Sequence, residues 1–273
     1  MSAAASGASS GPFYGGRSLG QILAVRRRVI GALMMRELTT RFGRSNLGFL
    51  WMFFEPLFLG GIVSALHSLR GHGQHGISIF TLSVIGYVPF FMLRAMINRA
   101  SSAIHSNLSL LYHRDVTLQD ICLSRNLIEF VAVCGVLLVF LAAAFWLAGE
   151  VPQSPFKIVA ALLLMGLLGH GFSMTVAGFA ALSEITDRIV HPLTYIMMPI
   201  SGAFFMVAWL PPSWREPALW IPFVSIHELL RDGQFGDKIV SYYDIPYVLY
   251  WILGMNLIGL STLRYARPRL DLY

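Results

Sequence analysis

The chain has 273 residues, of which 56% are hydrophobic and only 12% are charged. Soluble domains carry about 25% charged residues, so this chain has too little charge to cover a water-exposed surface. The composition therefore excludes most soluble enzymes and predicts an all-α integral membrane protein. Both cysteines, Cys122 and Cys134, lie in or beside one apolar run, so we expect neither a disulfide framework nor a Cys-based zinc site.

The segment before the first apolar run divides into a tail and a helix. Residues 1–18 are rich in Ser, Ala and Gly and lack the apolar core of a signal peptide, so a disordered cytoplasmic tail is expected there. Residues 19–44 are expected to form an amphipathic helix in the inner headgroup layer, with arginines 26–28 facing away from its apolar side. Its apolar positions recur at helical spacing at Ile22, Val25, Val29 and Leu33. Two roles stay open for this helix, a topology anchor or a binding surface.

Residues 45–273 are expected to hold six transmembrane helices. A bilayer core needs about 20 helical residues. The six apolar runs are Leu47–Leu66, Ile77–Leu93, Ile121–Leu147, Phe156–Leu182, Leu193–Leu210 and Tyr247–Leu263. The inner loop 98–120 is long enough for a short amphipathic helix. The outer segment 211–246, rich in Pro and Trp, predicts re-entrant short helices before the last span.

The distribution of basic residues predicts the orientation. With the N-terminus inside, only five of the 20 Lys and Arg residues fall on the outer side, namely Arg70, Lys157, Arg215, Arg231 and Lys238. Because basic residues gather on the cytoplasmic side, both termini should be cytoplasmic. The net charge of +6 then needs no nucleic-acid partner, since inner arginines lie beside anionic headgroups.

The sequence contains no recognisable catalytic motif. Neither Lys157 nor Lys238 lies in a phosphate-binding glycine loop, so the chain cannot be a P-loop ATPase by itself. His170 precedes Gly-Phe-Ser without the spacing of a hydrolase elbow, and we interpret it as a hydrogen-bonded core residue. A histidine cluster on the first outer loop could bind a metal, but a solvated loop is favoured and no metal site is expected. Its members are His67, His72 and His75.

One carboxylate lies in the middle of the first span. Placing Glu55 near the bilayer centre costs at least ~2.5 kcal/mol, so it must face protein or water. It could pair with an arginine such as Arg94, or line a translocation path. Aromatic residues share its face or lie in the fifth span, and they could pack, contact lipid or contact the apolar face of a sugar. They are Trp51, Phe54 and Phe58, with Phe204, Phe205 and Trp209.

Two stretches carry a resemblance to a known family. Arg36 to Leu57, RELTTRFGRSNLGFLWMFFEPL, resembles the arginine-rich approach to the first span, with L-G-x-x-W and E-P-L, in membrane subunits of type-2 ABC exporters. It is most similar to the permeases that export capsular polysaccharide or O-antigen in Gram-negative bacteria. Pro222 to Gly236, PFVSIHELLRDGQFG, supports this, although Ile221 stands where the family usually has Asn. The resemblance covers Gln21 to Arg269.

The resemblance implies an assembly that supplies what this chain lacks. It implies a homodimer of multi-pass permeases in the inner membrane, with a channel at the interface and two copies of a separate ATPase subunit that binds ATP and Mg²⁺. This chain would carry no cofactor. The substrate would be a lipid-linked capsular polysaccharide, and periplasmic and outer-membrane polysaccharide export proteins would be partners. The alternatives are a permease for O-antigen, a teichoic-acid-type glycan, a lipid or a drug, or an intramembrane enzyme that uses His170 or Glu55.

The resemblance also assigns candidate site residues, none of them catalytic. The substrate channel would be lined by Trp51, Phe54, Glu55, Phe58, Phe204, Phe205 and Trp209. The entrance for the anionic lipid end would use Arg41 and Arg44. Coupling to the ATPase would use Asn107, Tyr112, His113, Arg114 and Asp115, together with the helix before Arg44. The outer gate and docking surface would contain Trp214, Trp220, His227, Glu228 and Arg231.

Overall fold

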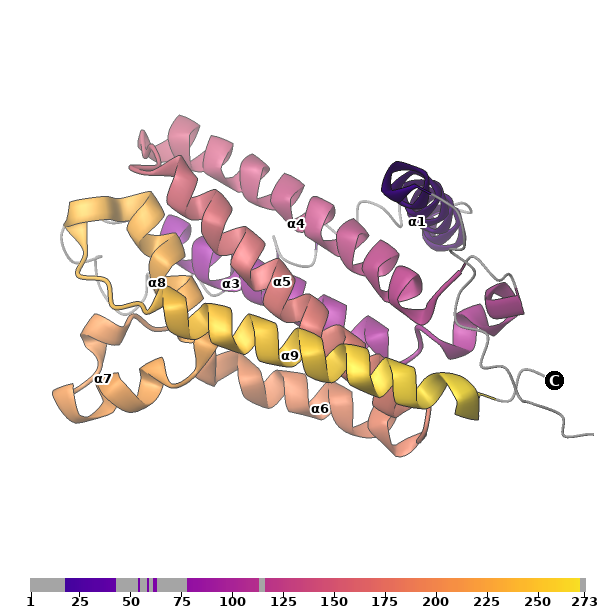
Figure 1. Cartoon of the computed structure of the whole chain (residues 1–273). Coiled ribbons are helices and arrows are strands. Elements are labelled where there is room, and N and C mark those ends of the chain that lie inside the picture. Colours follow the sequence, from indigo (N-terminus) through magenta and orange to yellow (C-terminus); the bar gives the residue numbers. More distant parts are fainter. Residues whose placement is uncertain are drawn as a thin grey trace, which may run out of the picture.

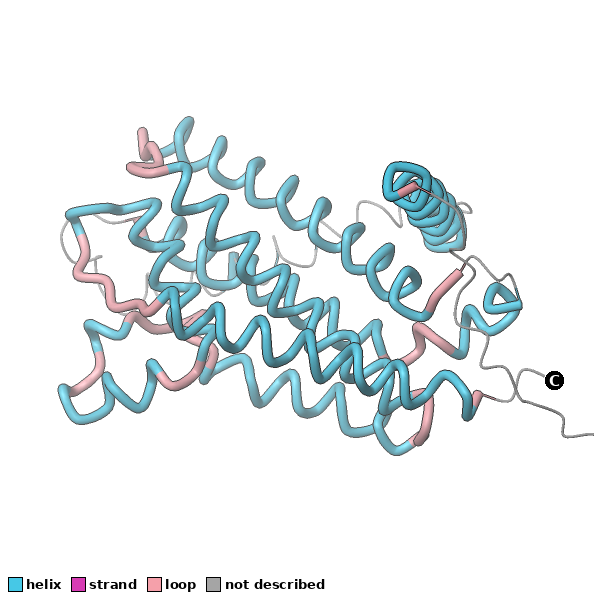
Figure 2. Tube along the Cα trace, viewed as in Figure 1, coloured by secondary structure: helices cyan, strands magenta, loops and turns pink. Residues whose placement is uncertain are grey.

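The computed structural model describes residues 18–42, 54, 58, 61–62, 78–112 and 116–270. Its α-helices are α1 (Leu19–Phe42), α3 (Ile79–Ala100), α4 (Leu118–Ala148), α5 (Pro155–Ala180), α6 (Ile185–Ile200), α7 (Pro212–Leu219), α8 (Pro222–Phe235) and α9 (Ile245–Ala266). Short 3₁₀ helices are η2 (His105–Tyr112), η3 (Val207–Trp209), η4 (Gly236–Lys238) and η5 (Arg267–Arg269). These residues include no strand, as Figure 2 shows, which confirms the predicted all-α class.

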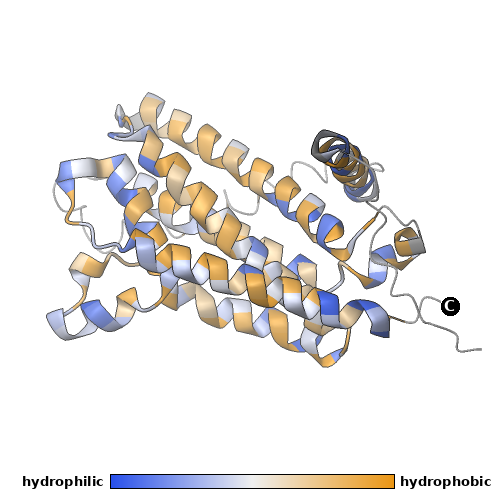
Figure 3. Ribbon diagram, viewed as in Figure 1, coloured by the Kyte–Doolittle hydropathy of each residue, from blue (hydrophilic) through white to orange (hydrophobic). Residues whose placement is uncertain are grey.

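Four helices in the described residues are long and apolar enough to cross a membrane. They span Phe80–Ala100, Leu118–Trp146, Pro155–Ala180 and Ile245–Arg269. Figure 3 shows apolar residues dominating the middle of the long helices, with polar residues gathered towards their ends. Helix α6 has 16 residues and is shorter than a typical span. The first predicted span, Leu47–Leu66, lies almost entirely outside the described residues, so the count of six stays a prediction.

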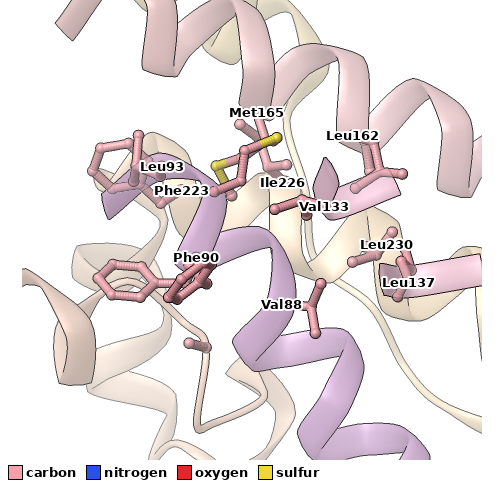
Figure 4. Packing of buried hydrophobic residues seen from close by; sticks show 14 of the residues in the cluster. Val88, Phe90, Leu93, Val133, Leu137, Leu162, Met165, Phe223, Ile226 and Leu230 are labelled. Carbon is pink, nitrogen blue, oxygen red and sulfur yellow. The ribbon is translucent and has the colours of Figure 1, made fainter. Parts of the chain in front are cut away.

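Helix α5 lies at the centre of the bundle. It packs against α3, α4, α8 and α9, and Figure 1 shows it running between α4 and α9 with α3 behind. The buried cluster shown in Figure 4 joins α3, α4, α5 and α8 through side chains such as Phe90, Leu137, Met165 and Phe223. In a membrane the hydrophobic effect does not drive this association, so close packing has to hold the helices together.

The chain connections divide between the two ends of the bundle. Helix α1, η2, the α5–α6 turn and the C-terminal end of α9 lie at one end, whereas the α4–α5 turn, α7 and α8 lie at the other (Figure 1). The predicted orientation makes these the inner and outer ends respectively. Helix α1 stands beside the bundle and is not aligned with its long helices (Figure 1). It ends at Phe42, within the predicted 19–44, and its position in the headgroup layer stays a prediction.

The fifth predicted span is displaced towards the N-terminus. We predicted Leu193–Leu210, but α6 begins at Ile185 and ends at Ile200. The helix carries Pro199 in its last turn and is followed by Gly202 with φ of 84°, a left-handed backbone that stops a helix. The apolar residues after Ile200 therefore form a turn and η3. The prediction placed the span too late because hydropathy alone does not detect a break in the backbone.

Helices α5 and α9 approach each other closely through glycines. A Cβ added at Gly259 of α9 would lie 2.7 Å from the Met174 Cβ and 2.9 Å from the Gly171 carbonyl oxygen of α5. A Cβ at Gly171 would meet the backbone of α9 at 2.9 Å. Small residues at a membrane helix interface let the two backbones come together, so these positions fix the spacing between α5 and α9.

We predict that Gly259→Ala weakens the bundle. The added methyl group meets backbone and Cβ atoms that cannot move cheaply, so unfolding should become easier by about 1–3 kcal/mol. Gly254→Ala on the same helix is the control, because a Cβ there has no atom within 4 Å. Thermal unfolding in detergent measures both variants. Equal melting temperatures for the two would contradict the close approach.

Candidate functional site

A buried carboxylate joins α1 to two helices of the bundle. Glu129 on α4 is 1% exposed, and its Oε1 lies 2.5 Å from Arg41 Nη1 on α1 and 3.0 Å from Arg99 Nε on α3. A charge in so apolar a helix is expensive unless it is paired. Glu129 therefore holds three separate elements at the inner end of the bundle.

A second carboxylate extends this network. Glu37 on α1 accepts a hydrogen bond from Arg41 Nε at 2.8 Å and forms an ion pair with Arg125 Nε of α4 across 3.2 Å. Partial burial by itself would raise the pKa of Glu37, but the charges of Arg125 and Arg41 outweigh burial and hold the pKa below its usual value. The Glu37 carboxylate therefore stays charged and keeps α1 aligned with α4.

Helix α1 also contacts η2, in the predicted coupling loop. Arg36 Nη1 donates to Asn107 Oδ1 at 2.6 Å, and Asn107 Nδ2 donates to the Ala103 carbonyl at 2.8 Å. Leu33 of α1 packs with Ala103 and Ile121 below these bonds. The structure thus brings together two regions predicted to couple to the ATPase, the helix before Arg44 and the inner loop.

We call the contacts among α1, η2, α3 and α4 the inner junction. Its polar residues are Arg36, Glu37, Arg41, Arg99, Asn107, Arg125 and Glu129. Of the predicted coupling residues, Asn107 is buried in this junction, Tyr112 is the last residue of η2, and residues 113–115 (His113, Arg114 and Asp115) lie outside the described residues. Arg41, predicted to meet a lipid headgroup, is shared between two carboxylates, and Arg44 lies outside the described part of the chain.

Most of the inner junction was not predicted from the sequence. The available signal was Glu129, a carboxylate inside the apolar run Ile121–Leu147, because such a residue needs a partner. The spacing of Glu37 and Arg41, four residues apart on a helix, also indicated a local pair. The pairing of Arg41 with Glu129 joins residues 88 positions apart, and no local pattern predicts it.

A second polar cluster lies inside the outer end of the bundle, on α8. His227, Glu228 and Arg231 are fully buried, although they were predicted to form an outer gate. Arg231 Nη2 donates to the carbonyls of Gly202 at 2.5 Å and Ala203 at 3.2 Å, and its Nη1 donates to Glu228 Oε1 at 3.2 Å. The Glu228 carboxylate accepts from the backbone N–H groups of Val207 and Tyr242, both at 3.2 Å.

These contacts make α8 a clamp for the loops around it. Arg231 holds the turn after α6, and Glu228 ties η3 to the chain that leads into α9. His227 Nε2 lies 3.0 Å from the Gly86 carbonyl of α3 and its Nδ1 lies 2.8 Å from the Phe223 carbonyl. Burial, followed by the charge of Arg231, lowers the pKa of His227 to about 4, so the imidazole is neutral near pH 7.

The predicted aromatic wall is only partly described. Phe54 and Phe58 stack with ring centroids 5.6 Å apart and stay about half exposed, whereas Trp51 and Glu55 lie outside the described residues. Two other residues predicted for the wall, Phe204 and Trp209, lie at the α8 clamp and line a small cavity there. Its lining residues are Leu82, Ser83, Ala203, Phe204, Trp209 and Arg231. Phe205 is partly buried beside them in the chain.

Other predicted residues take simpler positions. Trp214 and Trp220, at α7, are exposed at the outer end and are the accessible members of the predicted gate. His170 Nδ1 lies 2.8 Å from Asn126 Nδ2, which confirms the hydrogen-bonded core interpretation. Cys122 and Cys134 are free thiols. The three loop histidines at 67, 72 and 75 lie outside the described residues.

The apolar helices and the charged junction at one end of the bundle are features of a multi-pass membrane protein, and comparison with known families gives its class. Residues 28–235 match the family described as ABC-2 type transporter. The chain belongs to this family. The match confirms the resemblance inferred from the first-span motif, and it implies a partner ATPase, which ABC transporters require.

Curated relatives cover almost the whole chain. The chain is 38% identical to the capsule polysaccharide export inner-membrane protein CtrC of Neisseria meningitidis, over 89% of this chain and 93% of the relative. It is 36% identical, over the same shares, to the capsule polysaccharide export inner-membrane protein BexB of Haemophilus influenzae. It is 28% identical to the polysialic acid transport protein KpsM of Escherichia coli, over 88% and 94%. All three are named for export or transport, in agreement with a transport subunit.

We predict that Glu129→Gln loosens α1. The substitution leaves Arg41 and Arg99 without their shared carboxylate, and breaking a buried ion pair from one side costs about 3–5 kcal/mol. Hydrogen exchange of the α1 amides should therefore speed up strongly, while exchange in α5 and α9 changes little. Glu184→Gln, at an exposed position before α6, is the matched control. Unchanged protection of α1 would show that Glu129 does not hold it.

We predict that His227 makes stability depend on pH. The unfolded chain binds a proton below about pH 6.5 that the folded chain takes up only near pH 4. The contribution of His227 to stability is therefore complete above pH 6.5 and falls by up to about 1.4 kcal/mol per pH unit below it. Unfolding in detergent between pH 7 and pH 5 should show this slope.

The His227→Gln variant should flatten that slope even if it lowers stability at every pH. His191→Gln removes an exposed imidazole from α6 and serves as the control. A slope that His227→Gln leaves as steep as in the wild type would assign the pH dependence to other groups.

Proposed function

We propose that this chain is the permease subunit of an inner-membrane exporter that moves lipid-linked capsular polysaccharide, and that it works as a homodimer. The observation that carries the proposal is similarity, over 89% of this chain, to two proteins named for capsule polysaccharide export, at 38% and 36% identity. Both relatives are also named inner-membrane proteins, which supports the same location here. The distribution of arginines supports cytoplasmic termini.

The inner junction is the proposed docking place for the ATPase. Its surface element η2 contacts α1 through Arg36 and Asn107, and α1 contacts α3 and α4 through Glu129. A push on η2 or α1 would therefore reach two bundle helices through charged contacts that cannot stretch far without breaking. ATP-driven closure of two partner subunits would move the inner ends of both permeases and open a path between them.

The exposed aromatic residues are proposed to contact the polymer and its export partners. Phe54, Phe58 and Trp209 keep about half of their side chains accessible, and an aromatic face suits the C–H face of a sugar without fixing its position. At the outer end, Trp214 and Trp220 are proposed to meet periplasmic export proteins. Arg41 and Arg44 remain candidates for the anionic lipid end, with Arg41 shared between this role and its carboxylates.

A second polysaccharide class stays a candidate. The relative named for polysialic acid transport matches over 88% of this chain, and its named cargo is a polymer of carboxylated sugars. O-antigen and teichoic-acid-type glycans are alternatives within the same transport class. Membership of a transporter family leaves the intramembrane enzyme without a supporting observation.

The proposal is tested by deleting the gene from its host and restoring it on a plasmid. Deletion should leave polysaccharide inside the cell and remove it from the surface, and the wild-type gene should reverse both effects. Affinity purification of the tagged chain should recover an ATP-hydrolysing subunit in equal amount. Surface polysaccharide unaffected by deletion would reject the capsule proposal, and normal surface polysaccharide with a retained lipid or drug in the cell would favour those cargoes.

We predict that Arg36→Gln uncouples the exporter. It removes the charged hydrogen bond between α1 and η2, an interaction of about 1.5–3 kcal/mol. Surface polysaccharide should fall at least about fivefold while the complex still assembles and hydrolyses ATP. Arg28→Gln, on the exposed side of α1, should leave export close to normal. Equal export by the two variants would show that the hydrogen bond between α1 and η2 is not needed for coupling.

A further inference from the structure

Helix α3 is buried along almost its whole length, with one exception inside the span. Between Ser83 and Ile97 every residue of α3 is buried except Arg94. The one residue of this stretch that is not buried is therefore a cation. Arg94 lies six residues before the end of α3 at Ala100, or about 9 Å along the helix axis. A permanent charge at such a place in a span is unusual unless it has a partner or a task.

The Arg94 guanidinium lies over an aromatic ring of α6. Its central carbon is 4.0 Å from the centroid of Tyr195, a cation–π distance. One turn further along α3, Asn98 Oδ1 accepts a hydrogen bond from Thr194 Oγ1 at 3.1 Å. Tyr195 itself is 57% exposed. Two neighbouring polar contacts thus fix Arg94 and Tyr195 side by side, with much of the ring still accessible.

The guanidinium has no negative partner in the part of the chain that the structure describes. No carboxylate among those residues lies within 4.0 Å of it, and its Nε is buried without a hydrogen-bond partner. The other arginines of the inner half of α3 and α4, Arg99 and Arg125, each have a glutamate. A ring alone does not satisfy the five N–H donors of a guanidinium. Arg94 therefore keeps hydrogen-bond donor capacity that no carboxylate among the described residues satisfies.

We propose that Arg94 and Tyr195 form a binding site for an anionic group of the exported glycolipid, a carboxylate on a sugar or a phosphate on its lipid end. The proposal rests on the transport of an anionic glycan proposed above. Arg94 donates to the anionic oxygens, for which the guanidinium fork is suited. Tyr195 holds the guanidinium on one side and offers accessible ring surface to the adjoining sugar. The site lies between α3 and α6, towards the inner end of the bundle, and so takes the substrate early in its passage.

The test measures binding to the purified permease–ATPase complex in nanodiscs of phosphatidylcholine. The carboxylate probe is a sialic acid hexamer, with maltohexaose as its neutral match. The phosphate probe is dioctanoyl phosphatidylglycerol, with dioctanoyl phosphatidylcholine as its zwitterionic match. The wild type should bind one or both anionic probes at least about tenfold more tightly than the matched probes. ATP hydrolysis by each preparation shows that the complex is assembled.

Arg94→Gln should abolish this preference, weakening the anionic probe roughly ten- to hundredfold, because charged hydrogen bonds are worth about 1.5–3 kcal/mol and each 1.4 kcal/mol is tenfold in Kd. Tyr195→Phe keeps the ring and should retain most of the preference, whereas Tyr195→Leu should lose part of it. Arg264→Gln removes an exposed arginine from the inner end of α9 and should change nothing. Loss with the sialic acid hexamer alone assigns the site to the sugar, and loss with phosphatidylglycerol alone assigns it to the lipid end.

Two results would overturn the proposal. One is an Arg94→Gln complex that binds both anionic probes as tightly as the wild type does. The other is a result in which Arg94→Gln and Glu55→Gln each destabilise the complex, the double variant restores its stability, and no Kd changes. Arg94 would then be a structural partner of Glu55. A failure of the capsule export proposal in cells would leave the anion site standing, because the binding probes report that site whatever polymer the host makes.

Discussion

The structure depends on the pairing of charges that the chain places inside apolar helices. Glu129 is the clearest case, because it lies within a long apolar helix and gathers Arg41 from α1 and Arg99 from α3. An unpaired carboxylate there would destabilise the fold, and a paired one fixes three elements relative to one another. The same rule holds at the outer end, where Glu228 and Arg231 neutralise each other and use their remaining donors and acceptors to hold neighbouring loops.

The two charged clusters lie at opposite ends of a closely packed bundle, and each connects loops or surface helices to the long helices. Helix α5 and the glycines facing α9 set the helix spacing, the inner junction connects α1 and η2 to α3 and α4, and the α8 clamp connects the turn after α6 to the start of α9. Movement of the inner junction is then a movement of whole helices, because the core between the ends is closely packed. This is the property that an ATP-driven permease needs if hydrolysis occurs in a separate subunit.

Much of the fold was predictable from sequence because membrane helices have a strong signal. The apolar runs correctly predicted α4, α5 and α9, and the Pro- and Trp-rich outer segment correctly indicated short helices before the last span. The end of α6 was missed because Pro199 and Gly202 break the backbone inside an apolar run. The inner junction was missed because its ion pairs join residues far apart in the chain. The family motif suggested that His227, Glu228 and Arg231 form a gate, yet the structure buries all three. No local sequence pattern tells a buried polar residue of this kind from an exposed one.

The proposed docking place of the partner ATPase is the inner junction and not the α7–α8 end. A photo-reactive amino acid placed at Ser109, an exposed position of η2, tests it directly in intact cells, with the same probe at Trp214 of α7 as the comparison. If the ATPase docks at the inner junction, the probe at Ser109 should crosslink to the ATP-hydrolysing subunit and the probe at Trp214 should not. A crosslink from Trp214 with none from Ser109 would contradict both the orientation of the bundle and the docking role of the junction.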